Sequence, residues 1–411
     1  MNEEENLSLN VSAKTHIPSQ EFQGLELVQA ASPKTEAQMK QPEVEIQSNR
    51  RSFLKKSALA TGAAMVGAGL FGAGKVAFGQ ESPRKLTKGD TAILRFLAAA
   101  ELIESDLWTQ YAELGGLNPG QVPVEVNPNQ PLNGYQAALS KLDGDGPQYI
   151  SSNTHDEIGH ATFLNAYLES KGADPVNLDE FRTLPGTQAT QVSGVQGQLR
   201  LTNLMHLNVD TSWFIRYRSA TNPDFGATFP QAITITNRTA IPRTNADFGD
   251  TNHIQVIANT AAFHFGYIEQ GGSSLYAALS QKVSSLEVLK ITLGIGGDEI
   301  AHFLEWVDFS GNGVQPPVAP VSDQGLTFPN FFTTPGTSLF QPNLIFPVPC
   351  NFINANLPLC AVIRPSDDQF AGAKATIASF TSDGLFVGQT RKFFQVVNQL
   401  AEEADAATRE L

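Results

Sequence analysis

The sequence has few cysteines and a shortage of basic residues, and each shortage excludes a class of protein. Cys350 and Cys360 are the only cysteines, and with no third ligand nearby they do not predict a cysteine-ligated metal site. The net charge is −14, and the first 79 residues carry equal numbers of acidic and basic groups, so the acidic excess lies downstream. This balance argues against nucleic-acid binding. It is compatible with attraction of metal cations or with a solvated acidic surface that binds nothing.

Residues 1–79 are predicted to be a disordered leader followed by an export signal. The first 48 residues are polar and have no helical periodicity. Arg50 and Arg51 then precede Phe-Leu-Lys-Lys and an uncharged, Gly/Ala-rich run over 57–74, which is too weakly hydrophobic to predict a membrane span. This order is typical of a twin-arginine signal with a small-residue cleavage site at its end. An ordinary basic cluster is the alternative interpretation.

The export signal has consequences for location and for the cysteines. It predicts a periplasmic or secreted protein, or a membrane-anchored one if the signal stays uncleaved, and it implies the twin-arginine machinery as a partner. In an oxidising compartment, Cys350 and Cys360 are predicted to close a small loop as a disulfide. Two free thiols are the alternative.

A repeated pentapeptide is the strongest functional signal in the chain. Asp-Glu-Ile-Gly-His at 156–160 recurs as Asp-Glu-Ile-Ala-His at 298–302, so each copy contains Glu-x-x-His. On a helix, positions i and i+3 lie on one face about one turn apart. The carboxylate and the imidazole of each copy can therefore reach a common atom, most simply a metal ion. The four residues are Glu157, His160, Glu299 and His302.

A further glutamate precedes each pentapeptide in a repeated context. Glu104 follows an isoleucine and lies seven residues before Tyr111, and Glu269 has the same relation to Tyr276. The chain order is Glu, Glu-x-x-His, Glu, Glu-x-x-His, which is the ligand set of a dimetal carboxylate site in a four-helix bundle. Glu101 also lies on the inward face of the first helix. The repeat favours Glu104 over Glu101 as the ligand, and the alternative stays open.

Neighbouring residues are predicted to support these ligands. Asp156 and Asp298 are placed to accept the second ring proton of a histidine across the bundle, with solvent exposure or helix capping as the alternative. Tyr111 and Tyr276 lie on the ligand face, where they could bond a carboxylate or serve as a radical or electron relay. Core packing is the alternative for both tyrosines.

The ligand pattern falls in one predicted domain over 88–310. Its helical blocks are expected at about 88–113, 152–171, 252–281 and 284–309. A crossover insertion at about 173–250, rich in Pro, Thr, Asn and Gly, is expected to carry one helix around 195–207. Residues 311–411 are predicted to form an irregular, Pro-rich extension ending in a helix at about 388–409. His206 and His253 are not predicted to bind metal.

These motifs resemble the ferritin-like superfamily of bacterioferritins, rubrerythrins and manganese catalases. They are more similar to the ferritin-like domain of desiccation-related proteins, over four blocks that make up about a quarter of the chain. The resemblance implies an all-α, ferritin-like four-helix bundle that binds two iron or manganese ions. The export signal, the long crossover and the C-terminal extension depart from storage ferritins and argue against a hollow storage shell. The implied ligands are Glu104, Glu157, His160, Glu269, Glu299 and His302.

The donor set indicates the chemistry. Carboxylates with two imidazoles suit iron or manganese better than copper or structural zinc, and do not distinguish iron from manganese. A dimetal oxidoreductase acting on ferrous iron, oxygen or peroxide is the favoured hypothesis. The alternatives are a metal-binding protein without turnover and a stress- or desiccation-related structural protein with a vestigial site. The pattern predicts no oligomeric state.

Overall fold

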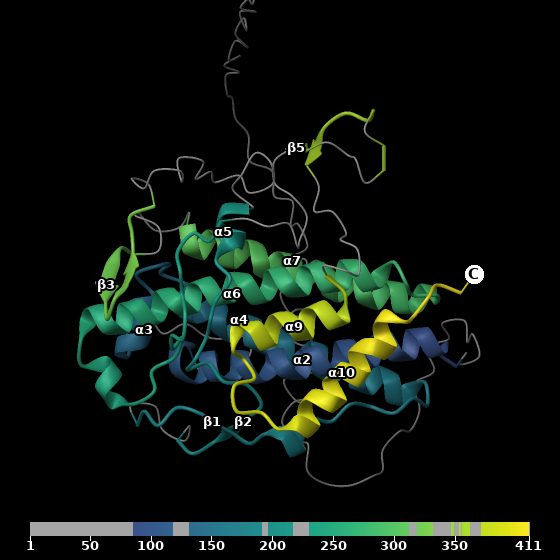
Figure 1. The fold of residues 1–411 in the computed structure, drawn as a ribbon, viewed down its shortest axis with the longest axis horizontal. Helices are drawn as coiled ribbons and strands as arrows, with labels where there is room; N and C mark the ends of the chain where they lie inside the picture. Colours follow the sequence, from purple (N-terminus) through teal and green to yellow (C-terminus); the bar gives the residue numbers. More distant parts are fainter. Residues whose placement is uncertain are drawn as a thin grey trace, which may run out of the picture. The chain divides into compact units, whose positions relative to one another are not determined.

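The computed structural model describes residues 85–117, 131–190, 196–216, 230–311, 319–331, 347–348, 353–354, 356–361 and 371–410. All of them belong to one compact unit, Gly72–Leu411, and they are drawn in colour in Figure 1. The leader and the export signal predicted over 1–79 lie outside the described residues. So does Cys350, which leaves the predicted disulfide untested. Cys360 is described and is exposed.

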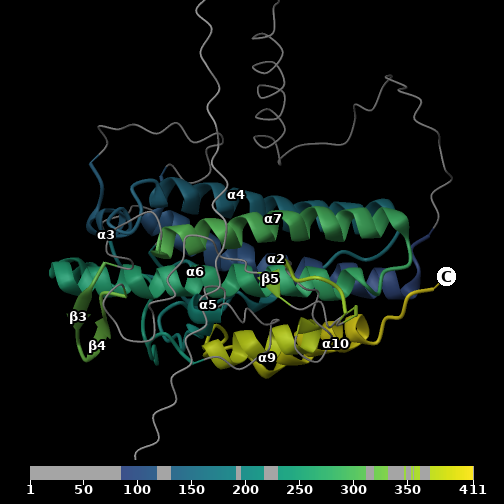
Figure 2. The ribbon, with the colours of Figure 1, turned by 90° about the horizontal axis from the view of Figure 1, so that it is seen from above.

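The described structure is mostly helical, which confirms the prediction of an all-α fold, and its longest elements are four helices. They are α2 (Lys88–Gly115), α4 (Gly146–Ser170), α6 (Thr251–Ser280) and α7 (Leu286–Gly311). Helix α2 packs on α4, α6 packs on α7, and α4 also contacts α7. Figures 1 and 2 both show the four helices side by side. The predicted blocks match these helices, except that α4 begins six residues earlier than expected.

Side-chain caps fix where the helices begin. Thr87 accepts a hydrogen bond from the Asp90 backbone N–H at 2.9 Å, which satisfies one of the unpaired donors at the start of α2. Asp250 does the same at the start of α6. The buried Asp90 carboxylate accepts from the backbone N–H groups of Ser284 and Ser285, at 2.8 and 3.0 Å. The start of α2 is thereby tied to the residues that lead into α7.

The four helices differ in how much of their surface is buried. In α6, 25 of 30 residues are buried, whereas in α4 only 10 of 25 are. A helix that is buried all round needs neighbours on every side. Figure 2 shows α9 and α10 on the side away from α4 and α7, and contacts join α10 to α2 and α9 to α6. Helix α6 is therefore the central helix, and α4 keeps an outer face in solvent.

The connection between α4 and α6 is mostly irregular and is held by a buried carboxylate. It contains β1 (Leu184–Pro185) paired antiparallel with β2 (Leu199–Arg200), and the short helices η1 (Asp179–Phe181), α5 (Ser212–Arg216) and η2 (Asn245–Phe248). Asp106 of α2 accepts from the backbone N–H groups of Leu201 and Thr202 and forms an ion pair with Arg182. The helix expected around 195–207 is wrong for the described part, 196–207, because β2 pairing and Asp106 take its backbone N–H groups.

The C-terminal extension is more regular than the sequence predicted. It contains the hairpin of β3 (Val321–Asp323) and β4 (Leu326–Phe328) and the pair of β5 (Pro347–Val348) with β6 (Cys360–Ala361). Helix α10 (Arg391–Asp405) is the expected final helix, but α9 (Ala373–Asp383) was not predicted.

A further short helix, α3 (Gly134–Leu139), lies between α2 and α4 in the sequence. Among the described residues, no helix is both long and apolar enough to cross a membrane.

Candidate metal centre

All four long helices contribute acidic or imidazole side chains to one buried cluster. Helix α2 provides Glu101, α6 provides Glu269, and each pentapeptide provides its Glu and His from α4 or α7. The side chains of Glu157, Glu269 and Glu299 are fully buried. Side chains that are far apart in the sequence therefore meet in the middle of the helices. Two groups of possible ligand atoms lie within this cluster, and a third lies between it and solvent.

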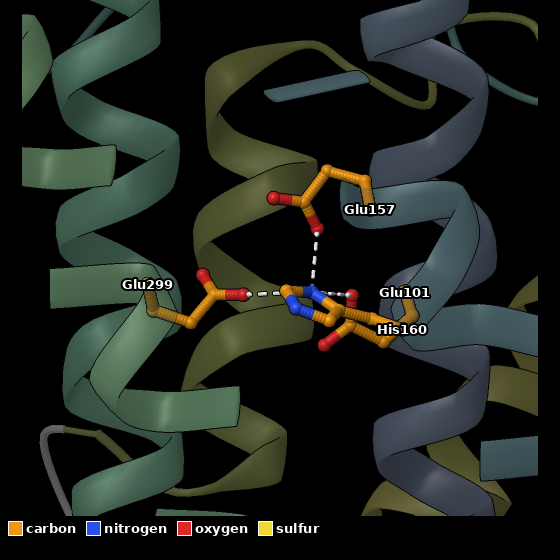
Figure 3. A group of neighbouring side chains, drawn as sticks. All are labelled: Glu101, Glu157, His160 and Glu299. Carbon is orange, nitrogen blue, oxygen red and sulfur yellow. Dashed lines mark hydrogen bonds and ion pairs between the residues drawn. The ribbon is translucent and has the colours of Figure 1, made fainter. Parts of the chain in front are cut away.

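The first group surrounds the imidazole of His160, as Figure 3 shows. His160 Nδ1 lies 3.5 Å from Glu101 Oε2, 3.4 Å from Glu157 Oε2 and 3.6 Å from Glu299 Oε1. Three carboxylate oxygens and one imidazole nitrogen, contributed by α2, α4 and α7, lie within 4.8 Å of one another. This is a donor set that one metal ion could hold.

The second group surrounds His302 in the same way. His302 Nδ1 lies 3.1 Å from Glu157 Oε1 and 3.4 Å from Glu269 Oε2, and Glu299 completes the group. Glu157 and Glu299 thus belong to both groups. The two oxygens of Glu157 face different imidazoles, Oε2 towards His160 and Oε1 towards His302. Two ions placed here would share these two carboxylates.

The second nitrogen of each imidazole faces an aspartate of the other pentapeptide. His160 Nε2 lies 3.1 Å from Asp298 Oδ2, and His302 Nε2 lies 3.4 Å from Asp156 Oδ2. Each aspartate therefore orients a ring across the α4–α7 interface, which is the position predicted from sequence. The side chains of Asp156 and Asp298 are 41% and 45% exposed. They lie between the buried cluster and solvent, and with His302 they form a third group of possible ligands.

The cluster contains buried carboxylate oxygens that no donor of the described residues satisfies. Both oxygens of Glu269 and Glu299, and Oε2 of Glu101, are buried without a hydrogen-bond partner in this part of the chain. Burial of an ionised carboxylate without a partner is costly, and a cation removes that cost. Gly272 shows that the helices leave room for these groups, because a Cβ there would lie 1.9 Å from Glu299 Oε2. The residues present fit a metal centre.

Burial and mutual repulsion raise the pKa values of Glu157 and Glu299. The pKa of Glu157 rises to about 7, chiefly through burial and then through Glu269. Burial, followed by repulsion from Glu157, puts the pKa of Glu299 well above its usual range. For His160, burial lowers the pKa, but the neighbouring carboxylates of Asp298, Glu101 and Glu157 outweigh it and raise the pKa to about 12. The cluster therefore holds protons that a metal ion would displace.

Helix α2 carries two buried glutamates beside the cluster. Glu101 belongs to the first group of ligand atoms, and its Oε1 accepts a hydrogen bond from the Tyr276 hydroxyl. Glu104 lies in none of the groups, although it is buried and close enough for Glu157 and Glu101 to raise its pKa, after burial itself. The sequence favoured Glu104, whereas the geometry brings Glu101 to the imidazole. Which of the two binds metal stays a prediction.

The two tyrosines and two histidines considered from the sequence lie in different surroundings. Tyr276 bonds a carboxylate of the cluster, but the Tyr111 hydroxyl lies 2.8 Å from His264 Nδ1 instead. His206 lies outside the three groups of ligand atoms, as does His253, which is held between two aspartates.

Sequence reasoning missed two residues that contact the ligands or lie beside them. Asn153 donates to Glu157 Oε1 at 2.9 Å and lies 3.3 Å from His302 Nδ1. It lies one helical turn before Glu157, so the helical spacing could have indicated it. Glu305 lies three residues after His302, and burial raises its pKa to about 7.

No family model, curated protein or solved structure matches the chain. The class of protein therefore has to be inferred from the described structure alone. The described residues form a mostly helical protein with buried Glu/His groups that could hold metal ions.

Proposed function

We propose that the protein is a ferritin-like dimetal carboxylate protein that binds two iron or manganese ions and uses them in redox chemistry with ferrous iron, oxygen or peroxide. One observation carries the proposal: two four-residue groups, each with one imidazole, share Glu157 and Glu299. A pair of sites joined by two carboxylates suits two neighbouring cations. Hard oxygen donors with two nitrogens favour iron or manganese.

The surrounding residues support this assignment. Asp298 and Asp156 orient the two imidazoles so that Nδ1 of each points at the carboxylates. Tyr276 fixes one oxygen of Glu101 and leaves the other towards His160. Bound iron or manganese would supply one-electron redox chemistry. The ligand carboxylates are buried whereas the two aspartates are partly exposed, so bound ions would be reached from solvent on the aspartate side.

We also propose that the protein is exported through the twin-arginine route, on the basis of Arg50 and Arg51. Copper and zinc outrank manganese and ferrous iron at most nitrogen and oxygen sites. A protein that folds around its ions before export avoids that competition. Export in the folded state would thus let this ligand set keep iron or manganese in the presence of copper and zinc.

Metal analysis and turnover assays test the proposal. The full-length protein purified from iron- or manganese-replete cells should contain two ions per chain and should consume oxygen or peroxide. Glu157→Gln and Glu299→Gln should lose both properties, because each residue belongs to both groups. Glu113→Gln is the matched control, since Glu113 is on α2 but pairs with Arg200. Metal-free protein from such cells would contradict the proposal and favour a vestigial site; loaded protein without turnover would favour metal binding alone.

A further inference from the structure

A buried aromatic chain begins beside the metal centre. Trp306 lies one helical turn after His302 on α7, and its Nε1 donates to Asn153 Oδ1 at 2.6 Å. Asn153 in turn donates to Glu157 Oε1 at 2.9 Å. An indole ring is thus connected to a shared carboxylate of the cluster through one amide side chain.

The chain continues across the core to α2. The rings of Trp306 and Trp108 are stacked, with centroids 5.3 Å apart and an interplanar angle of 19°. Trp108 is followed by Tyr111 at 5.6 Å, and Phe265 contacts all three rings. All four side chains are buried with essentially no exposed surface. Three oxidisable rings therefore follow one another within the buried core.

The chain ends at a base. The Tyr111 hydroxyl lies 2.8 Å from His264 Nδ1, and His264 Nε2 lies 3.0 Å from Asp383 Oδ2. The carboxylate accepts the Nε2 proton, so Nδ1 is left as the acceptor for the phenol. Asp383 is the last residue of α9, and His264 is fully buried. The C-terminal extension thus supplies a group that polarises an imidazole inside the helices.

The proton acceptors decide which ring can hold an oxidising equivalent. The Trp108 N–H has no hydrogen-bond partner among the described residues, and the Trp306 N–H faces an amide oxygen, which is a weak base. Neither indole can pass on its proton when it loses an electron. Tyr111 alone of the three faces an imidazole that can take its proton. A positive charge that moves along the chain should therefore stop at Tyr111.

We propose that Tyr111 is a one-electron donor to the metal centre, with Trp108 and Trp306 as the path and His264 as the proton acceptor. The step rests on the proposed function, because its oxidant is a metal ion oxidised by peroxide or oxygen. Tyr111 would give up one electron, and that oxidised ion would accept it. The phenolic O–H bond breaks and an N–H bond forms at His264 Nδ1, which leaves a neutral phenoxyl radical beside an imidazolium paired with Asp383.

Freeze-quench electron paramagnetic resonance tests the complete path. Full-length, ferrous-loaded protein is mixed with hydrogen peroxide, and a tyrosyl radical is expected in the wild type and in Tyr135→Phe. Tyr135 is the matched control because it is equally buried but donates to a backbone carbonyl, Ala240 O, at 2.7 Å. Tyr111→Phe should lose the signal. A signal that survives in Tyr111→Phe and disappears in Tyr276→Phe would overturn the proposal and assign the radical to Tyr276.

Flash photo-ionisation of tryptophan separates the path from the metal chemistry. In the full-length chain without added metal, the tryptophan radical should transfer its charge to tyrosine in the wild type and in Tyr135→Phe. This charge transfer appears as a kinetic phase, which should vanish in Tyr111→Phe. It should slow in His264→Gln, which keeps a polar partner for Tyr111 but removes the base. An unchanged phase in Tyr111→Phe overturns the path whatever the metal does. A normal phase together with no radical after peroxide supports the path and counts against the redox function proposed above.

Discussion

Gly272 on α6 lies directly against Glu299 on α7, so that a Cβ at residue 272 would stand 1.9 Å from the carboxylate oxygen Oε2. Glu299 belongs to both groups of ligand atoms. The glycine is therefore a requirement of the cluster, although glycine costs a helix interior about 1 kcal/mol relative to alanine.

Gly272→Ala should displace the Glu299 carboxylate and reduce the metal content below two ions per chain. Steric overpacking should also destabilise the protein by about 1–3 kcal/mol. Gly271→Ala is the control, because no atom of the described residues lies within 4 Å of a Cβ there. That variant should keep its metal and unfold at an equal or higher temperature. Plasma emission spectrometry with thermal unfolding checks both, and a fully loaded Gly272→Ala protein would contradict the role given to the glycine.

Asp298→Asn should weaken metal binding without abolishing it. The aspartate orients His160 from the far side of the ring, and loss of such a partner reduces metal affinity about 10–100-fold. Asp308→Asn, an exposed position on the same helix, should leave the affinity unchanged. Competition with a chelator measures the difference. Equal affinities for the two variants would show that Asp298 does not support the ligand.

Without metal, the protein should become less stable as pH rises. The pKa of Glu157 is raised from 4.5 to about 7, and that of His160 from 6.5 to about 12. In both cases the folded state keeps a proton that the unfolded state has lost, so stability falls by about 1.4 kcal/mol per pH unit and group within these windows. The chelator-treated protein should therefore have a lower unfolding midpoint at pH 8 than at pH 5.5. Glu157→Gln should reduce the loss of stability with rising pH in the range below pH 7.

Metal loading should show the opposite dependence on pH. The ions displace the protons held by the cluster, so apparent affinity should rise between about pH 5 and pH 7. Titration of the metal in weakly and strongly buffered solutions measures the released protons. An affinity that does not change over this range would mean that the protons are not displaced.

Replacement of Arg50 and Arg51 by lysine should strand a folded, metal-loaded precursor in the cytoplasm. The twin-arginine route requires the arginine pair and transports folded proteins. The Cys350–Cys360 disulfide should then form only in the exported wild type. Lys55→Arg with Lys56→Arg keeps the charge and the arginine pair, and should be exported normally. Cell fractionation with thiol labelling distinguishes these results, and export of the double-lysine protein would refute the link between signal and metal loading.

The helices and most of the cluster could be predicted because they depend on local spacing. The Glu-x-x-His repeat places Glu157 beside His160, and the same holds for Glu299 and His302, whatever the packing. Helical periodicity could not separate Glu101 from Glu104, because both lie on the inward face. Their placement depends on Tyr276, which reaches Glu101 from another helix, 175 residues away in the sequence.

Long-range partners also explain what the sequence did not predict. The segment at 196–207 is not helical because Asp106, 95 residues earlier, accepts its backbone N–H groups. Helix α9 has few inward apolar residues, such as Ile377 and Phe380, and a glycine rather than a capping side chain before it. His264 acquires its role from Asp383, 119 residues later. None of these relations leaves a local pattern.

The unequal burial of the helices implies where the structure opens first. Backbone amides of α6, which is covered on nearly all sides, should exchange with deuterated solvent last, whereas those of α4 should exchange earlier. Glu269 lies on the slowly exchanging helix α6, whereas the half-exposed Asp156 and Asp298 lie on the side of the cluster where exchange should be faster. If the proposed ions bind, we expect them to enter and leave by local opening of α4 and α7, with a residence time that does not depend on the rate of global unfolding.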